Sequence, residues 1–313
     1  MNIKKIVYSF FIIFFLNFWS NIAKSENSSF VVLKVNNQLI TNIDIQNEKN
    51  YLLAINQNLE SLDDKKLYEI AKASIIREKI KKNELRKYFN IDIYTKYIDN
   101  ILEDFYTKLN FENIESLENY LLSKNLQIDT VKNKLNIEAL WNELIYKRYN
   151  KQVEIDKEKL RKKIKEQKYK KESELFFVSE IIFSANNKSE IENKYKEILE
   201  SINEIGFKNT ANIYSISNTA KFGGEVGWVN KSRMSDNISV KLENIKIGGI
   251  TDLIKVPNGF LIIKVLDKKM ETIEQNEEED LKQLIIYERD RQLNEFSSIY
   301  FQKIKKSSLI NEK

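Results

Sequence analysis

The sequence predicts an α+β fold with a mainly helical region and a smaller domain that combines strands and helices. Apolar residues recur at helical spacing from about residue 41 to 149 and again after residue 270. All seven glycines and the only proline, in contrast, fall between residues 206 and 259. Two aromatic and β-branched runs flank this window, at 174–183 and 259–267. The strands and tight turns are therefore expected in the smaller domain.

The first 25 residues predict a secretory signal peptide. A basic head, "MNIKK", precedes an apolar run over Ile6–Trp19, and small residues follow at Ala23 and Ser25. The run is shorter than the roughly 20 residues of a membrane span, which favours a cleaved signal over an anchor. We place the cleavage after Ser25; the alternative is an uncleaved signal anchor.

Composition excludes several classes of protein. Cleavage would remove Lys4, Lys5 and Lys24 and no acid, lowering the formal net charge from +5 to +2. This near balance, together with export, argues against nucleic acid as a partner. The chain has no cysteine, which excludes disulfides, thiolate chemistry and a lipid-anchored lipoprotein, and no histidine, the commonest general base and metal ligand.

The sequence also predicts no cofactor and no nucleotide partner, because it contains no nucleotide-binding glycine motif. No second apolar run of spanning length follows the signal. We therefore expect no stable membrane span after cleavage, and an exported protein located in the periplasm.

Residues 26–172 are predicted as the helical domain. A strand from Phe30 leads through a turn at Asn36 and Asn37 into a second strand, and a helix capped at Thr41 or Asn42 follows. A second long helix is expected behind a cap at Asp63 or Asp64. The helical stripe of 94–105 and shorter helices at 114–124 and 129–149 come next, and the basic segment 151–171 is expected to be a solvated helical connector. The stripe consists of Tyr94, Tyr97, Ile98, Ile101, Leu102 and Phe105.

Residues 173–269 are predicted as the second domain. It begins with a strand at 174–183, continues with helices at 189–205, 206–215 and 238–245, and closes with a buried strand at 259–267. The glycine-rich stretch "AKFGGEVGWV" forms a tight loop between the second and third helices. From Met270 to residue 313 the chain is expected to be one long helix with acids first and lysines last, as the helix dipole favours.

Four motifs follow one another within residues 174–268 of the second domain: "FGGEVGW", "SRMSDNI", "KIGGITDLIKVPNGF" and "LIIKV". In this order they resemble the motifs of the parvulin (PpiC or rotamase) family of peptidyl-prolyl isomerases. The resemblance implies a small antiparallel sheet flanked by helices. The regions on either side are similar to the SurA family of periplasmic chaperones, in which the terminal helix returns to complete the N-terminal helical domain.

The parvulin pattern implies a polar centre with two histidines on neighbouring strands and a cysteine or aspartate before the glycine loop. The matching positions here are Glu180, Leu261 and Ser217. Since Leu261 cannot form a hydrogen bond, the resemblance assigns no catalytic residue to these degenerate positions. Glu180 is expected on a semi-buried strand face with a raised pKa, and Ser217 is its nearest candidate partner.

The apolar slot that grips a proline ring is retained in part. The resemblance points to Met234, Ile238 and Phe260 as substrate-binding residues. The glycines of the loop, Gly223, Gly224 and Gly227, are expected for conformational reasons, because a tight loop before a strand needs positive φ or close backbone approach. An active and an inactive parvulin domain would share that need.

The resemblance implies an ATP-independent periplasmic chaperone that binds unfolded outer-membrane proteins or other extended polypeptides. The 15 tyrosines and 17 phenylalanines offer apolar surface for such chains. With both histidine positions substituted, we expect the parvulin domain to be weak or inactive as an isomerase. The alternatives are an active parvulin isomerase and a secreted helical scaffold whose parvulin unit mediates assembly.

Overall fold

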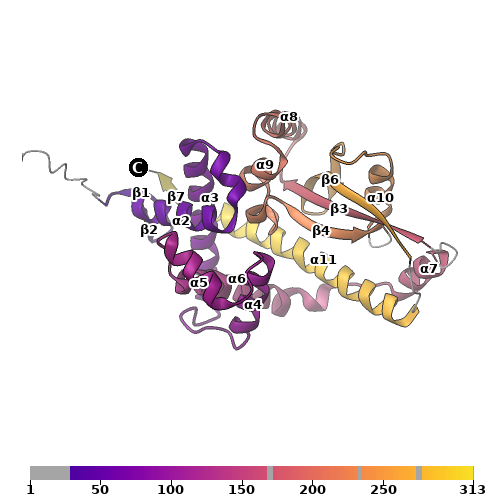
Figure 1. Cartoon of the computed structure of the whole chain (residues 1–313), viewed down its shortest axis with the longest axis horizontal. Helices are drawn as coiled ribbons and strands as arrows, with labels where there is room; N and C mark the ends of the chain where they lie inside the picture. The colour runs from indigo at the N-terminus through magenta and orange to yellow at the C-terminus, as the bar shows by residue number, and fades with distance from the viewer. Residues whose placement is uncertain (1–28, 168–171, 232–233, 273–276, 313) are drawn as a thin grey trace, which may run out of the picture.

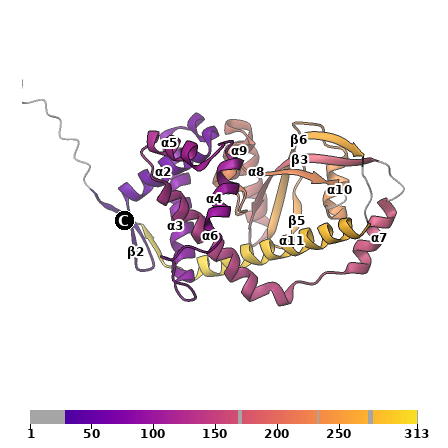
Figure 2. The same cartoon turned by 60° about the horizontal axis from the view of Figure 1, so that its bottom comes forward.

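A computed structural model describes residues 29–167, 172–231, 234–272 and 277–312. The predicted signal peptide lies outside the described residues. The chain forms a helical domain and a sheet domain side by side, and one long helix runs along both (Figures 1 and 2). No described helix is both long and apolar enough to span a bilayer.

The helical domain begins with a β-hairpin and continues as a bundle. Its hairpin turns at Asn36, whose φ is 52°. Thr41 then caps the first helix. The Thr41 hydroxyl accepts a hydrogen bond from the Asp44 N–H, and the Asp44 side chain accepts one from the Thr41 N–H. This reciprocal capping box confirms the predicted helix start. The elements are β1 (Val31–Val35), β2 (Gln38–Thr41), α2 (Asn42–Ile55), η1 (Gln57–Ser61), α3 (Asp64–Leu85), α4 (Ile98–Lys108), α5 (Ile114–Ser123), α6 (Ile128–Tyr149) and η2 (Asn150–Gln152).

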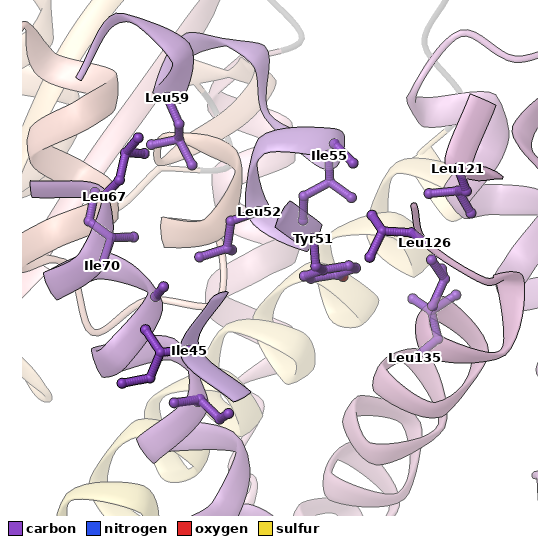
Figure 3. Close-up of a cluster of buried hydrophobic side chains, with 14 of the residues drawn as sticks. Ile45, Tyr51, Leu52, Ile55, Leu59, Leu67, Ile70, Leu121, Leu126 and Leu135 are labelled. Carbon is purple, nitrogen blue, oxygen red and sulfur yellow. The ribbon is translucent and has the colours of Figure 1, made fainter. Parts of the chain in front are cut away.

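The core of the helical domain is built around α2. Figure 3 shows the side chains of Leu52 and Ile55 between those of α3 on one side and those of residues 121–135 on the other. The predicted stripe of 94–105 is only partly confirmed. Leu102 and Phe105 are buried on α4, but Tyr94 and Tyr97 precede the helix and are exposed, because the chain turns at 95–98 before the helix begins.

The sheet domain is an antiparallel sheet with the strand order β4-β3-β6-β5. Sequence reasoning predicted β3 and β6 but missed β4 and β5, which are short edge strands. It also placed the start of the C-terminal helix too early, at Met270: β6 continues to Thr272, Met270 pairs with Glu174, and the helix covers Glu277–Lys306. The elements are β3 (Glu172–Phe183), α8 (Lys188–Ile205), α9 (Phe207–Tyr214), η3 (Ala220–Phe222), β4 (Glu225–Asn230), α10 (Asp236–Glu243), β5 (Ile254–Val256) and β6 (Gly259–Thr272).

The two faces of this sheet carry separate cores. On one face, Ile181 of β3 and Ile262 of β6 pack with α8 and α9. On the other, Leu261 and Ile263 pack with α10 and its preceding loop. Because successive strand residues point to opposite faces, both strands are buried on both sides. The near-continuous apolar run of 259–267 predicted this for β6.

The C-terminal helix α11 (Glu277–Lys306) returns to the helical domain. The buried Trp141 of α6 donates from Nε1 to Ser297 Oγ at 2.9 Å and stacks on Tyr300 with a ring-centroid distance of 5.7 Å. The start of α11 packs against α7 (Lys157–Gln167), the helix of the predicted basic connector. After α11, the unpredicted strand β7 (Ile310–Glu312) pairs with β1, so the chain ends beside its first described strand (Figure 1).

The sheet domain docks on the helical domain through α9, η3 and the end of α8. Phe222 and Ile213 pack against the core of the helical domain. Polar contacts surround them: the Lys66 ammonium lies 2.9 Å from a Glu204 carboxylate oxygen, and Asn56 Nδ2 lies 3.4 Å from both Asn212 Oδ1 and the Lys221 carbonyl oxygen. The two domains therefore share a seam with apolar contacts and hydrogen bonds.

Replacing Trp141 with alanine should destabilise the protein strongly, because the residue joins α6 to α11 from a fully buried position. We expect a loss of about 3–5 kcal/mol in the free energy of unfolding, measured by urea denaturation. Trp228→Ala is the matched control, since Trp228 is 41% exposed on β4, and it should cost less than about 1.5 kcal/mol. Equal losses for both variants would contradict this role of Trp141.

Candidate functional site

Glu180 and Leu261, which the parvulin resemblance aligns with two histidines, lie on the same face of the sheet. Glu180 on β3 is opposite Ile263 on β6, and Ile182 is opposite Leu261. Residues two apart on a strand point the same way, so Leu261 is a diagonal neighbour of Glu180. Leu261 is only 5% exposed and belongs to the apolar core of this face.

The Glu180 carboxyl group is held by two hydroxyl groups from the loop that precedes β4. Ser217 Oγ donates to Glu180 Oε1 at 2.5 Å. Thr219 Oγ1 lies 3.0 Å from the same carboxyl oxygen and 3.0 Å from Ser217 Oγ. The structure therefore brings Glu180 and Ser217 together, as the sequence predicted, and adds Thr219, which the sequence analysis missed. The sequence did contain a sign of this role, because Thr219 places a second hydroxyl group two residues after Ser217.

Burial raises the pKa of the Glu180 carboxyl group, and the hydrogen bonds from Ser217 and Thr219 partly oppose this effect by lowering it. The direction agrees with the expectation from the sequence. A carboxyl group in this setting can accept hydrogen bonds and exchange one proton. Its diagonal neighbour Leu261 has a neutral apolar side chain, so it cannot share that proton.

The glycine loop joins this polar cluster to β4. The Glu180 N–H donates to the Gly224 carbonyl oxygen at 2.8 Å, and a Cβ on Gly224 would lie 2.2 Å from the Glu180 carbonyl oxygen. Gly223, Gly224 and Gly227 all have positive φ, between 70° and 96°. Gly224 therefore allows the loop to approach β3 closely, and any side chain there would push the two backbones apart.

The predicted slot residues separate into two groups. Met234 and Ile238 lie in the same apolar core as Leu261, beside Glu180 on the α10 face. Met234 is 5% exposed, and the Lys163 ammonium of α7 donates to its carbonyl oxygen at 2.6 Å. Side chains of the domain thus pack closely at this wall and leave little of Met234 or Leu261 exposed to a substrate.

Phe260 does not belong to this wall. It packs on the opposite face of the sheet, with its ring centroid 5.7 Å from that of Phe183. The prediction that grouped it with Met234 and Ile238 is wrong, because Phe260 is one residue before Leu261 and adjacent strand residues point to opposite faces.

The loop that carries Ser217 and Thr219 is held by the helical domain. The Arg77 guanidinium of α3 donates to the Ser215 carbonyl oxygen at 3.3 Å, and Ser215 Oγ accepts from the Ile182 N–H at 3.1 Å. At the other end of the loop, Phe222 packs into the seam with the Lys108 ammonium 5.1 Å from its ring centroid. The polar cluster at Glu180 is thus connected by backbone and hydrogen bonds to the domain interface.

A cleft of about 560 Å³ opens along the same seam. Phe111, Tyr120 and Phe222 contribute aromatic side chains to its lining, and Phe111 and Tyr120 contact each other with ring centroids 5.1 Å apart. Its other wall includes Val226 and Gly227 of β4, the strand at the edge of the sheet. Aromatic surface and an unpaired strand edge are both suited to an extended polypeptide.

In the parts of the chain that the structure describes, no group of three or more acidic, cysteine or histidine side chains is arranged to hold a metal ion. The chemistry of the candidate site consists of one carboxyl group, two hydroxyl groups and an apolar wall.

The comparison with protein families identifies the sheet domain. A family model, the rotamase "PPIC-type PPIASE domain", matches residues 175–267. The matched segment contains Glu180, Ser217, Leu261 and the glycine loop. Its bounds fall within β3 and β6, the central strands of the sheet.

The chain is also similar to proteins named as chaperones. It is 36% identical over 55 residues to the Chaperone SurA of Pseudomonas putida, a match that covers 18% of this chain and 13% of that protein. The solved structures include a PpiC-type peptidyl-prolyl cis-trans isomerase domain at 25% identity and a TM-score of 0.30, which covers 33% of this chain and 96% of that chain.

A further structure comes from Campylobacter jejuni, whose PEB4 and Cj1289 are described together as two structurally related SurA-like chaperones. It is 17% identical, has a TM-score of 0.35, and covers 90% of this chain and 98% of that chain.

Glu180→Gln should change how stability depends on pH. Because the folded-state pKa of Glu180 is raised, its stabilising contribution is present below the ordinary glutamate pKa of about 4.3 and is lost as pH rises through the folded value. The free energy of unfolding of Glu180→Gln, measured by urea denaturation across pH, should therefore improve relative to wild type as pH rises.

Glu190→Gln serves as a control with the opposite sign. A side-chain hydrogen bond from Lys194, followed by a backbone hydrogen bond from Asn186, lowers the pKa of Glu190 to about 2. The free energy of unfolding of wild type should exceed that of Glu190→Gln above a pH of about 4.3. This difference should disappear as the pH falls toward the folded-state pKa of Glu190. Parallel pH profiles for wild type and Glu180→Gln would contradict the burial effect on Glu180.

Proposed function

We propose that this chain, in which a PpiC-type domain model matches residues 175–267 and 55 residues are 36% identical to a Chaperone SurA, is an ATP-independent chaperone for extended polypeptides. Its clients in this proposal are unfolded outer-membrane proteins. The proposal places the protein in the periplasm, exported by the predicted signal peptide, and gives it no cofactor.

The cleft between the two domains is the observation that carries this proposal. Its aromatic side chains, Phe111, Tyr120 and Phe222, can contact apolar client side chains without requiring a particular sequence. The edge of β4 can add main-chain hydrogen bonds that any extended chain satisfies. Binding of this kind needs no nucleotide, since the client contacts a surface that is already formed.

We further propose that the parvulin domain is weak or inactive as an isomerase. Rotation about a peptide bond has a barrier of about 18–20 kcal/mol, so catalysis requires groups that stabilise the twisted amide. At this site, Leu261 supplies none, and Glu180 is already bonded to Ser217 and Thr219. The proposal treats the domain as a rigid part of the binding surface.

An active isomerase is the second candidate function. The wall that contains Met234 and Ile238 favours it, because these residues lie on the same face as Glu180. In this alternative the carboxyl and hydroxyl groups of the polar cluster would replace the histidines. The two candidates differ in whether proline isomerisation is faster than the uncatalysed reaction.

Suppression of aggregation tests the chaperone proposal. The chain from residue 26 onward, mixed in equimolar amount with an unfolded β-barrel protein, should reduce light scattering. No effect on scattering and no measurable client affinity would overturn the proposal.

A charge at the β4 edge should weaken this effect. Val226 is 44% exposed beside the cleft, and a lysine there opposes the addition of another strand. We expect Val226→Lys to lower client affinity about tenfold, which corresponds to about 1.4 kcal/mol. Val240→Lys is the control, because Val240 is 59% exposed on α10 and does not line the cleft. Equal affinities for the two variants would exclude the β4 edge as a client contact.

A protease-coupled assay on a proline tetrapeptide tests the isomerase. We expect the wild-type rate to equal the uncatalysed rate, for which exchange takes tens to hundreds of seconds. A gain of activity only in Glu180→His/Leu261→His would show that the slot still binds proline and that the polar centre was lost. Wild-type activity that Met234→Ala abolishes would support the second candidate instead. Thermal melting of each variant checks that it is folded.

A further inference from the structure

A second cavity, of about 380 Å³, lies on the α9 face of the sheet, opposite the candidate parvulin site. Its floor includes Ser179 of β3 and Lys264 of β6, which are paired across the two strands. Its walls are the first turn of α9 and the η1 segment of the helical domain. The cavity therefore exists only because the sheet domain docks on the helical domain.

Polar groups line this cavity without partners. Ser179 is fully buried, and its hydroxyl group has no hydrogen-bond partner among the described residues. The same holds for Oδ1 of Asn209, which is 6% exposed; its amide nitrogen is bonded to Ser61 and Ile205. Buried polar groups in native proteins are nearly always hydrogen-bonded, so these two groups are expected to bind a ligand.

Positive charge at the cavity is not fully balanced. Lys264 is half-buried, and no described acid forms an ion pair with its ammonium group. Lys208, which also lines the cavity, is paired with Glu225 at 3.2 Å, and Glu204 beside the cavity is paired with Lys66. Of the two lysines that line the cavity, only Lys264 has no acidic side chain paired with its ammonium group among the described residues.

The N-terminus of α9 adds to this positive potential. Gly206 is its N-cap, and no side chain caps the helix. The first turn, which lines the cavity, leaves N–H groups without intrahelical partners, and the helix dipole places partial positive charge there. An uncapped helix N-terminus beside an unpaired ammonium and a buried unpartnered hydroxyl group is suited to an anion.

We propose that this cavity binds a carboxylate group of an extended polypeptide. The carboxylate would accept hydrogen bonds from the Ser179 hydroxyl group, from the N–H groups at the start of α9 and from the Lys264 ammonium. Asn209 Oδ1 can only accept, so it would take the N–H of the amide next to the carboxylate. A polypeptide supplies both groups, whereas a simple inorganic anion would leave Asn209 Oδ1 unsatisfied.

The position of the cavity agrees with a polypeptide ligand. Gln57, Asn58 and Lys208 line both this cavity and the aromatic cleft, so the two lie next to each other along the seam. An extended chain in the cleft could place a carboxylate in the cavity. The inference rests on the proposed binding of polypeptides. It specifies where the C-terminal carboxylate or an acidic side chain of the client is held.

Fluorescence anisotropy with synthetic peptides tests the proposal on the chain from residue 26 onward. The probes form two matched pairs. The first pair is an aromatic-rich peptide with a free C-terminus and the same peptide with a C-terminal amide. In the second pair both peptides are amidated, and one has an internal Glu where the other has Gln. Loss of affinity in the C-terminal amide would identify the α-carboxylate as the ligand. Tighter binding of the Glu peptide would identify an acidic side chain. Either result supports the site, and equal binding of all four peptides overturns it.

Variants then locate the site. Hydrogen bonds to charged groups are stronger than those between neutral groups, so Lys264→Met should weaken binding of the carboxylate peptide about tenfold or more and leave binding of its amide unchanged. Lys264→Arg should restore most of the affinity, and Ser179→Ala should weaken binding by a smaller factor. Lys255→Met, on the exposed side of the neighbouring strand β5, is the matched control. Equal affinity in Lys264→Met and Lys255→Met would overturn the proposal.

The outcome separates this site from the proposed chaperone function. If aggregation is suppressed but Lys264→Met changes no peptide affinity, the chaperone proposal holds and the carboxylate site is wrong. If carboxylate peptides bind through Lys264 but aggregation is not suppressed, the site holds and the chaperone proposal is wrong. Competition by acetate, but not by sodium chloride at equal ionic strength, should accompany a carboxylate site.

Discussion

The packing of α9 and η3 against α2, η1 and α3 is the contact on which the other features of this protein depend. It holds Phe222 against the core of the helical domain and places the Ser215 carbonyl oxygen within reach of Arg77. The loop between these points carries Ser217 and Thr219, so docking of the domains and the position of the polar cluster are coupled. The same packing encloses the aromatic cleft and the cavity at Ser179.

Glu180 lies at the centre of the proposal that this parvulin domain keeps its fold with an altered polar centre. Its backbone is held by Gly224 on one side and β6 on the other, as the sheet requires. Oε1 of its carboxyl group accepts hydrogen bonds from two hydroxyl groups of the docked loop, which offset part of the cost of burying it. In our proposal, the two positions that the parvulin resemblance aligns with histidines are occupied by Glu180, a hydrogen-bond acceptor in this cluster, and by the core residue Leu261.

The two faces of the sheet consequently have different roles in our proposals. The α10 face contains the altered centre and its packed apolar wall. The seam beside the α9 face contains aromatic side chains, an unpaired strand edge, an uncapped helix and an unpaired ammonium group, all within one continuous region. These are groups that bind a chain through main-chain, apolar and charge contacts, and they belong to both domains. Binding would therefore depend on how the domains are docked.

The sequence by itself determined the features that depend on neighbouring residues in the chain. The cap at Thr41, the tight loop at Gly223 and Gly224, the amphipathic helices and the buried runs of β3 and β6 all follow from local pattern and backbone conformation. The partnership of Ser217 with Glu180 was also predictable, because the parvulin pattern aligns both positions.

Only the tertiary structure decided which distant groups meet. It placed Phe260 away from Met234, added Thr219 to Glu180, and paired β7 with β1 across nearly the whole chain. It also brought Ser179, Lys264 and the start of α9 into one cavity. Strand register and the docking of two domains set these contacts, and both depend on the combined packing of many side chains that no single stretch of sequence contains.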